Sequence, residues 1–289
     1  MSVVVREVAV KDLLTKSNLP ATDYVINPYV GCPHGCRYCY ASFMKRFTGH
    51  TEDWGTFIDI KRCSKKIDIK KLTGKTVFLS SVTDCYNKYE ETYRCTREVL
   101  EQLVHSDAYV SISTKSDLIL RDVDLLKQFR HLTVAMSVNT LDETFRRDMD
   151  DASPIADRLH ALKTMHDGGI TTVLFMSPIF PYITDCRKIL ECSHEFIDEY
   201  WFENLNLRGA YKPVILEYVR SHYPRYAEQY RRIYIGGDDY YWDVLAQKLS
   251  GYCRAHGIQC KNYFHHSKLV QNKRNGTIRS QKNYYDSSC

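Results

Sequence analysis

The sequence predicts an α/β fold, a partial (β/α)6 TIM-like barrel with a helical, basic C-terminal extension. Two observations predict this fold. Short β-rich runs alternate with helix-like stretches roughly every 25–35 residues, a rhythm typical of βα units with parallel strands. No Gly-rich dinucleotide fingerprint follows the first run, and this disfavours the competing doubly wound sheet.

The expected elements follow one another in a regular order. Six strands are expected, at residues 24–26, 76–82, 108–114, 132–138, 171–177 and about 202–207. The helix-like stretches span about 90–105, 117–129, 142–149, 153–167 and 184–199. The stretch 153–167 opens with Ser153 and Pro154, which predicts an N-cap followed by a proline in the first turn, and it ends at Gly168-Gly169, a stop signal.

This order divides the chain into three parts: an N-terminal lead-in over 1–22, the barrel over 23–211, and a helical extension with a basic tail over 212–289. Within the tail, the segment 261–282 carries six basic residues and no acidic one. A solvated tail is the favoured interpretation, and a phosphate-contacting arm is the alternative. The six residues are Lys261, Lys268, Lys273, Arg274, Arg279 and Lys282.

Composition excludes a membrane protein and favours a cytoplasmic one. The N-terminus, MSVVVREVAVKDLL, has no long apolar stretch, and no segment approaches the roughly 20 apolar residues that a spanning helix needs. The net charge of +5 permits contact with nucleic acid without implying it. The eleven cysteines, an odd number, indicate thiols and metal ligands rather than a disulfide framework.

The most informative segment is Asn27–Ala41, NPYVGCPHGCRYCYA, directly after the first expected strand. Cys32, Cys36 and Cys39 are spaced C-x3-C-x2-C, close enough for three thiolates to surround one soft metal centre. A four-iron cubane held by three cysteines keeps one iron open for a substrate or cofactor. The spacing therefore predicts a [4Fe–4S] cluster.

Zinc is the alternative metal. His34 lies inside the loop and could be a fourth ligand, but structural zinc sites usually pair two separated knuckles. Cys253 and Cys260 are separated by six residues, lie far from other cysteines and form no second knuckle. The spacing disfavours zinc.

The cysteine loop, with Tyr38 before the last cysteine, resembles the radical S-adenosylmethionine (SAM) superfamily. Its wider pattern, NPYxGCxHxCxYCYA, resembles the spore photoproduct lyase-like branch, often labelled "DNA repair photolyase". Further motifs extend the likeness over about 24–211: Ser80–Asp84, Thr114–Asp122, Ser137–Asn139 and Phe202–Arg208.

Three longer segments resemble one subgroup more closely, the "radical SAM mobile pair protein B" group. They read ASFMKRFTGHTEDWGTF, MSPIFPYITD and FENLNLRGAYK. Members of that group resemble partners encoded beside a second radical SAM protein on mobile elements. The likeness implies such a partner for this chain.

The resemblance implies a [4Fe–4S] cluster that binds SAM at its open iron and cleaves it reductively to a 5′-deoxyadenosyl radical. It also implies an electron donor such as flavodoxin or ferredoxin. Lys115 and Ser137 match family positions that contact the carboxylate and ribose of SAM. For Lys115 the alternative is a solvated lysine at a strand end.

Further candidate cofactor-binding residues flank these positions. Thr83, Asp84 and Asn139 could bond the amino or hydroxyl groups of SAM. Tyr38 and Tyr40 flank the last cysteine and are expected to pack on the adenine or to line the substrate mouth. Aromatic core packing is the alternative for both tyrosines.

Cys85 departs from the pattern of the branch. The lyases use a hydrogen-atom-donating cysteine near the end of the second strand, and here a thiol stands several residues past that position, where many relatives have proline. Cys85 is therefore a candidate hydrogen-atom donor, with an inert buried cysteine as the alternative. The shift also puts a thymine-dimer substrate in doubt.

The leading functional hypothesis is a lyase-like radical SAM enzyme that acts on a nucleic-acid base or lesion. A second hypothesis is modification of a peptide or small molecule, because fold and cofactor do not select the substrate. A third is a non-catalytic, metal-stabilised protein that binds nucleic acid. The three cysteines together with Lys115 and Ser137 disfavour the third hypothesis.

Overall fold

The computed structural model describes residues 2–19 and 22–264, and its centre is an eight-stranded sheet ordered β11-β10-β9-β8-β7-β6-β3-β2. Neighbouring strands from β3 to β11 run parallel, and only β2 is antiparallel to its neighbour. The strands are β2 Leu14–Lys16, β3 Tyr24–Ile26, β6 Thr76–Leu79, β7 Tyr109–Thr114, β8 Leu132–Ser137, β9 Thr171–Ile179, β10 Glu199–Asn204 and β11 Cys260–Asn262.

The six strands expected from the sequence are all present, which confirms the α/β partial barrel. β11 was not expected. It extends the sheet beyond β10 and contains Lys261, which forms an ion pair with Glu199 at 2.8 Å. Lys261 is therefore part of the barrel sheet and not of a solvated tail. The five other basic residues of the run lie outside the described residues.

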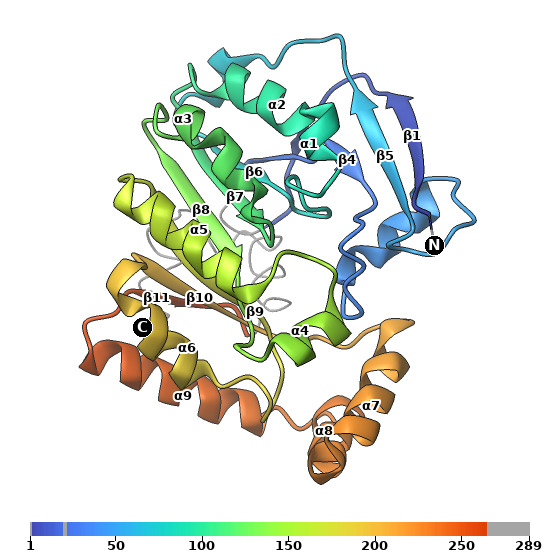
Figure 1. Cartoon of the computed structure of the whole chain (residues 1–289), viewed down its shortest axis with the longest axis vertical. Helices are drawn as coiled ribbons and strands as arrows, with labels where there is room; N and C mark the ends of the chain where they lie inside the picture. Colours follow the sequence, from blue (N-terminus) through green and yellow to red (C-terminus); the bar gives the residue numbers. More distant parts are fainter. Residues whose placement is uncertain (1, 20–21, 265–289) are drawn as a thin grey trace.

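Helices cover the outer side of the sheet, with α2, α3, α5, α6 and α9 lying along it (Figure 1). Each expected helical stretch contains a helix, although Arg94, with φ of 53°, divides the first one in two. The helices are α1 Glu90–Tyr93, α2 Cys95–Leu103, α3 Val123–Leu126, α4 Glu143–Met149, α5 Ile155–Asp167 and α6 Cys186–Ser193.

The start of α5 corrects one expectation. Pro154 has an extended backbone and is the residue before the helix, not the first residue within it. The Ser153 hydroxyl does not cap the helix either, because it donates a hydrogen bond to Asp117 Oδ1 at 2.6 Å. The predicted stop is correct, since α5 ends at Asp167 and Gly169 adopts a φ of +80°.

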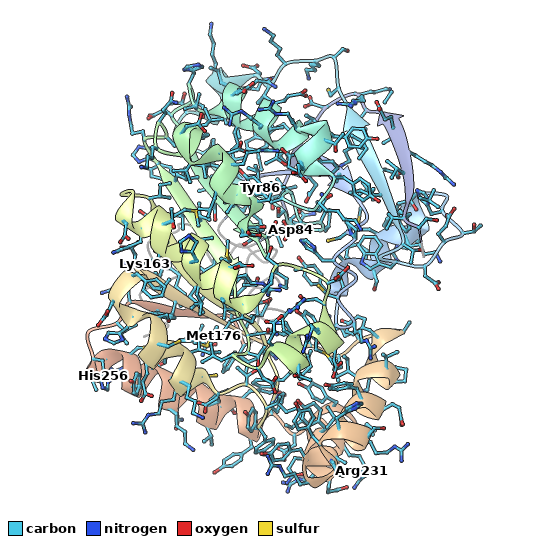
Figure 2. The ribbon with its side chains drawn as sticks, viewed as in Figure 1. Asp84, Tyr86, Lys163, Met176, Arg231 and His256 are labelled. Carbon is cyan, nitrogen blue, oxygen red and sulfur yellow. The ribbon has the colours of Figure 1, made fainter. Side chains whose placement is uncertain are left out.

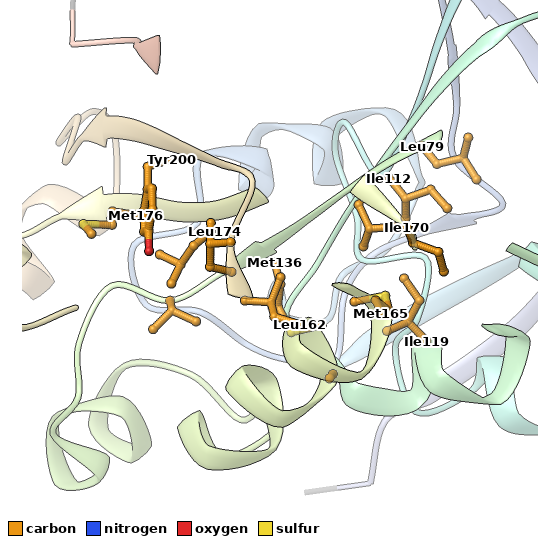
Figure 3. Close-up of a cluster of buried hydrophobic side chains, with 14 of the residues drawn as sticks. Leu79, Ile112, Ile119, Met136, Leu162, Met165, Ile170, Leu174, Met176 and Tyr200 are labelled. Atoms are coloured by element: carbon orange, nitrogen blue, oxygen red, sulfur yellow. The ribbon is translucent and has the colours of Figure 1, made fainter. Parts of the chain in front are cut away.

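Alternate side chains of the strands build the main core between sheet and helices. Ile112, Met136 and Leu174 point toward Leu162 and Met165 of α5 (Figure 3), and all five are fully buried. Replacing such a side chain with alanine typically costs about 2–5 kcal/mol. The other face of each strand is left to line the barrel interior.

A second, three-stranded sheet lies beside the barrel (Figure 1). It has the order β1-β5-β4, with β1 parallel and β4 antiparallel to β5. The sequence gives no sign of this sheet, because β4 is only two residues long and the partners of β5 are far apart in the chain. Its strands are β1 Val4–Ala9, β4 Tyr29–Val30 and β5 Phe57–Arg62.

Three further helices follow the barrel, and they are rich in tyrosine. They are α7 Tyr211–His222, α8 Ala227–Tyr234 and α9 Tyr240–Ala255. Side chains of α7 and α8 form a second core cluster with Tyr38, Phe145 and Phe180. Over residues 2–19 and 22–264, no helix is long and apolar enough to cross a bilayer.

Candidate functional site

The cysteine loop follows β4 and is pressed against the start of β5. Gly31 has a φ of +85°, and a Cβ atom there would lie 2.4 Å from the backbone oxygen of Phe57. Gly55 has a φ of +99°, and its Cβ would lie 3.0 Å from the Cα of Gly35. Glycine is required at both contacts, because a side chain would force the loop away from residues 55–57.

Cys32, Cys36 and Cys39 all carry free thiols in this loop. Cys32 is buried, the other two are partly buried, and Trp54 Nε1 donates a hydrogen bond to Cys39 Sγ at 3.3 Å. Burial raises the pKa of the Cys36 thiol well above its ordinary value, and the neighbouring charges of Asp150, Cys39 and Cys32 add to the rise. A thiol in this setting loses its proton readily only when a metal binds its sulfur.

The donor set fits an iron–sulfur cluster better than zinc. Among the side chains that the structure describes, no three of His, Cys, Asp or Glu converge on a single ion. His34, the fourth ligand that zinc would need, lies instead 3.2 Å from Asp84 Oδ2. A cubane takes each thiolate on a different iron, so its ligands need not converge.

Asp84 connects three loops near the middle of the molecule (Figure 2). Its carboxylate accepts hydrogen bonds from Thr114 Oγ1 and from the Lys115 backbone N–H, both at 2.7 Å. Burial alone raises the pKa of Asp84, but the adjacent His34 and these hydrogen bonds outweigh it and lower the pKa to about 2. The carboxylate holds the ends of β6 and β7 against the cysteine loop.

Two other candidates also hydrogen-bond within the protein. The Thr83 hydroxyl donates to the Gly31 carbonyl at 2.6 Å, which ties the loop after β6 to the cysteine loop. The Asn139 amide donates to the Pro178 carbonyl at 3.1 Å, and its backbone carbonyl accepts from Thr184. Both side chains therefore join neighbouring strand ends.

Lys115 and Ser137 stand at the carboxyl ends of β7 and β8. In the described part of the chain, the Lys115 ammonium forms no hydrogen bond or ion pair and lies 5.9 Å from the centre of the Tyr38 ring. The Ser137 hydroxyl likewise has no hydrogen bond to described residues, although the Ser137 carbonyl accepts one from Arg158 at 3.1 Å. A partly buried ammonium and a free hydroxyl suit a ligand with a carboxylate and hydroxyl groups.

The two tyrosines of the loop differ in their surroundings. Tyr38 is buried, its hydroxyl donates to Asp150 Oδ2 at 2.9 Å, and its ring meets Phe180 edge-on at 5.5 Å. Tyr40 is exposed, and its hydroxyl donates to the Ser81 carbonyl. Tyr38 thus has the contacts of a core residue, whereas Tyr40 presents its ring to the outside.

Cys85 lies in the main core with no exposed surface. Its backbone N–H donates to Ser80 Oγ at 2.9 Å, and its carbonyl accepts from Thr96 Oγ1 at 2.6 Å. Burial raises the pKa of the thiol well above its ordinary value. These surroundings favour the buried-cysteine alternative over a hydrogen-atom donor.

Sequence reasoning missed the buried pair of Asp150 and Arg158, whose side chains lie 2.8 Å apart. Arg158 also donates to the Ser153 carbonyl at 2.7 Å. One backbone hydrogen bond, from the Arg37 N–H to the Met149 carbonyl at 2.9 Å, attaches the cysteine loop to the same turn. No local motif marks these residues, because the pair forms only when α4 and α5 pack beside the loop.

A family model described as the Radical SAM superfamily matches residues 26–191, more than half of the chain. Among curated proteins, the uncharacterized protein MJ0683 of Methanocaldococcus jannaschii is 34% identical over 220 residues, covering 75% of this chain and 83% of that protein. The uncharacterized protein ORF301 of Acidianus two-tailed virus is 29% identical over 219 residues, covering 68% of this chain and 71% of that protein.

Solved structures show the same fold at low identity. Spore photoproduct lyase complexed with dinucleoside spore photoproduct is 15% identical with a TM-score of 0.53, covering 76% of this chain and 66% of that one. Streptococcus suis SuiB bound to SAM is 14% identical with a TM-score of 0.52, covering 85% of this chain and 51% of that one. Radical SAM proteins use a [4Fe–4S] cluster and SAM. The chain is an enzyme of the radical SAM superfamily.

Proposed function

We propose that Cys32, Cys36 and Cys39 hold the [4Fe–4S] cluster of this enzyme and that Lys115 and Ser137 bind SAM beside it. The observation that carries the proposal is the loop of three free thiols at the end of the sheet where the Lys115 ammonium has no ion-pair partner among the described residues. When bound, the cluster and SAM supply a one-electron cleavage of the sulfur–carbon bond of SAM.

The chain's own residues bind and orient in this scheme. Lys115 pairs with the SAM carboxylate, and the Ser137 hydroxyl forms one hydrogen bond with a ribose hydroxyl. Thr83 ties the cysteine loop to the segment after β6 through the Gly31 carbonyl at 2.6 Å, and Asp84, which lies 3.2 Å from His34 of the loop, is itself held by the Lys115 N–H at 2.7 Å. Because these hydrogen bonds are internal, the loop is held in place before any ligand arrives.

We further propose a nucleic-acid base or lesion as the substrate. Support comes from the structural neighbours, which include spore photoproduct lyase in complex with a dinucleoside spore photoproduct. The net charge of +5 is compatible with a polyanionic partner. Modification of a peptide or small molecule is the competing substrate class, and the experiment below separates the two.

The proposal also includes an electron donor, a cellular compartment and a protein partner. Radical SAM enzymes generally need a reductant, and we propose flavodoxin or ferredoxin as the electron donor and the cytoplasm as the compartment. The likeness to the mobile pair group supports a second radical SAM protein encoded nearby. Copurification of that second radical SAM protein with this chain would test the proposed partnership.

The test is SAM cleavage by anaerobically reconstituted, reduced protein, followed as 5′-deoxyadenosine and by the mass of recovered nucleosides. UV-irradiated DNA, undamaged DNA and RNA are compared with buffer. We expect cleavage with wild-type protein, a change in rate with one nucleic acid, and a nucleoside of altered mass. Cys39→Ala should abolish cleavage, whereas Cys192→Ala, at an exposed cysteine outside the loop, should retain it.

Two outcomes would contradict the proposal at different points. Cleavage that no nucleic acid alters, with no altered nucleoside, would favour a peptide or small-molecule substrate. Intact cluster binding without SAM cleavage would favour a non-catalytic protein that binds nucleic acid.

A further inference from the structure

One row of residues on the inner face of the sheet differs from its surroundings. The strand register aligns Ser137, Phe175, Trp201 and Lys261 across β8, β9, β10 and β11. Their neighbours along the strands, such as Met176 and Phe202, belong to the main core under the helices. Because successive side chains of a strand point to opposite faces, the row faces the barrel interior.

Phe175, Trp201 and Tyr263 form an aromatic triad in that interior. The ring of Phe175 lies 5.6 Å from that of Trp201 and 6.2 Å from that of Tyr263, and Trp201 lies 5.9 Å from Tyr263. All three contacts are edge-to-face. The Trp201 indole N–H donates to Glu199 at 2.9 Å, and the Lys261 ammonium lies 5.5 Å above the Trp201 ring, so the triad is fixed in orientation.

Polar groups extend from the triad toward the cysteine loop. Glu203 follows Trp201 by two residues on β10 and accepts a hydrogen bond from the hydroxyl of Ser177, which follows Phe175 by two residues on β9. The inner face thus presents aromatic rings at the level of Phe175 and Trp201, and a carboxylate closer to the carboxyl ends of the strands, where the proposed cluster lies.

The interior also contains two serine hydroxyl groups that have no partner among the residues that the structure describes. Ser111 and Ser113 of β7 share the inner face, because they align with Thr133 and Ala135 of β8 in the same alternation. Both hydroxyl oxygens are buried and have no hydrogen-bond partner within residues 2–19 and 22–264. Buried polar groups are nearly always satisfied, so orphaned hydroxyls here indicate a surface built to meet a polar ligand.

From this arrangement we infer that the aromatic triad stacks a planar nitrogen heterocycle of the substrate while Glu203 accepts hydrogen bonds from its N–H edge. The inference rests on the proposed nucleic-acid substrate and names the residues that read the base. A nucleobase matches both halves of the surface, because it has a π-face for stacking and ring or exocyclic N–H donors for a carboxylate. The adenine of SAM has the same chemistry, so the test must separate the two sources.

The probe is a single-stranded DNA hexamer with 2-aminopurine at its centre, whose fluorescence falls when the base stacks on an aromatic ring. Binding is measured at one fixed salt concentration with the reconstituted full chain. We expect quenching with wild-type protein. Trp201→Leu should abolish the quenching and weaken hexamer binding about tenfold or more, the range for loss of one stacked base. Glu203→Gln should weaken binding while quenching persists.

Matched controls are Tyr240→Leu, at an exposed aromatic of α9, and Glu228→Gln, at an exposed carboxylate of α8. Both should bind and quench as the wild type does. SAM affinity, measured separately by calorimetry, should change less than about twofold in Trp201→Leu, and the circular dichroism spectrum should remain native.

Each contrary result has a distinct meaning. Hexamer binding and quenching that survive in Trp201→Leu and Glu203→Gln would overturn the inference and leave the proposed function standing. A loss of SAM affinity in place of hexamer affinity would assign the triad to the adenine of the cofactor and also overturn it. A wild-type protein that cleaves SAM but binds no hexamer would overturn both the inference and the nucleic-acid substrate.

Discussion

Arg158→Met is the substitution that best tests how the cysteine loop is held. The guanidinium of Arg158 is fully buried and pairs with Asp150 at 2.8 Å, while Asp150 accepts a hydrogen bond from Tyr38 in the loop. Methionine fills similar space without the charge. The variant therefore leaves the buried Asp150 carboxylate without its ion-pair partner and removes the donor for the carbonyls of Ser137 and Ser153.

The expected cost follows from these contacts. Removing one partner of a buried ion pair typically costs about 3–5 kcal/mol. Each carbonyl that loses its donor adds about 1 kcal/mol, although relaxation of the turn recovers part of that. We therefore expect the free energy of unfolding to fall by roughly 4–6 kcal/mol, a large share of the total stability of about 5–15 kcal/mol that domains have.

The assay is urea-induced unfolding of metal-free protein, followed by circular dichroism. Arg187→Met is the matched control, because Arg187 forms a pair with Glu191 on the exposed surface of α6 and its loss should leave the free energy of unfolding close to that of the wild type. Arg158→Met combined with Asp150→Asn should regain at least about 1 kcal/mol over Arg158→Met alone. A cost below about 1 kcal/mol for Arg158→Met, or no regain in the double variant, would refute the reasoning.

Three further predictions concern other residues. Trp54→Phe removes the hydrogen bond to Cys39 Sγ and should lower the midpoint potential of the bound cluster by roughly 40 mV, measured by redox titration with electron paramagnetic resonance; an unchanged potential would contradict it. Cys85→Ala should cost about 1 kcal/mol in urea unfolding and leave the reaction product unchanged; loss of solvent deuterium from the product would instead identify Cys85 as the hydrogen-atom donor. Burial alone would raise the pKa of Asp122, but hydrogen bonds from Arg121 and Arg97 outweigh burial and hold the pKa below its ordinary value. The stabilising contribution of Asp122 is therefore present above the ordinary aspartate pKa of about 3.9 and is lost as pH falls through the lowered value. Asp122→Asn should therefore flatten the loss of stability below about pH 4, and an identical pH profile would contradict this.

Most of the fold could be predicted from local patterns of apolar residues in the sequence. The runs at 108–114 and 132–138 became β7 and β8 because their alternate residues, such as Ile112 and Met136, are apolar enough to mark a strand on their own. β11 and β4 could not be predicted in this way. Each is two or three residues long and exists only because a neighbouring strand offers it a hydrogen-bonding edge.

The candidate site likewise contains residues that local motifs could predict and residues whose contacts depend on long-range packing. The spacing of the three cysteines and the positions of Lys115 and Ser137 follow from contiguous motifs at strand ends, so the sequence could nominate them. Trp54 could not be nominated, because its contact with Cys39 depends on how the segment before β5 folds back over the loop. Tyr38 was nominated for adenine or the substrate mouth, but its buried hydroxyl bond to Asp150 depends on long-range packing that no motif encodes.

The central claim is that the loop of Cys32, Cys36 and Cys39 binds a [4Fe–4S] cluster that meets SAM. The most direct measurement is the electron paramagnetic resonance spectrum of the reduced, anaerobically reconstituted protein with and without SAM. We predict a reduced [4Fe–4S] signal that changes shape when SAM is added and that is lost when any one of the three cysteines is replaced by alanine. Stoichiometric zinc with no reducible signal, or a signal that SAM leaves unchanged, would contradict the claim.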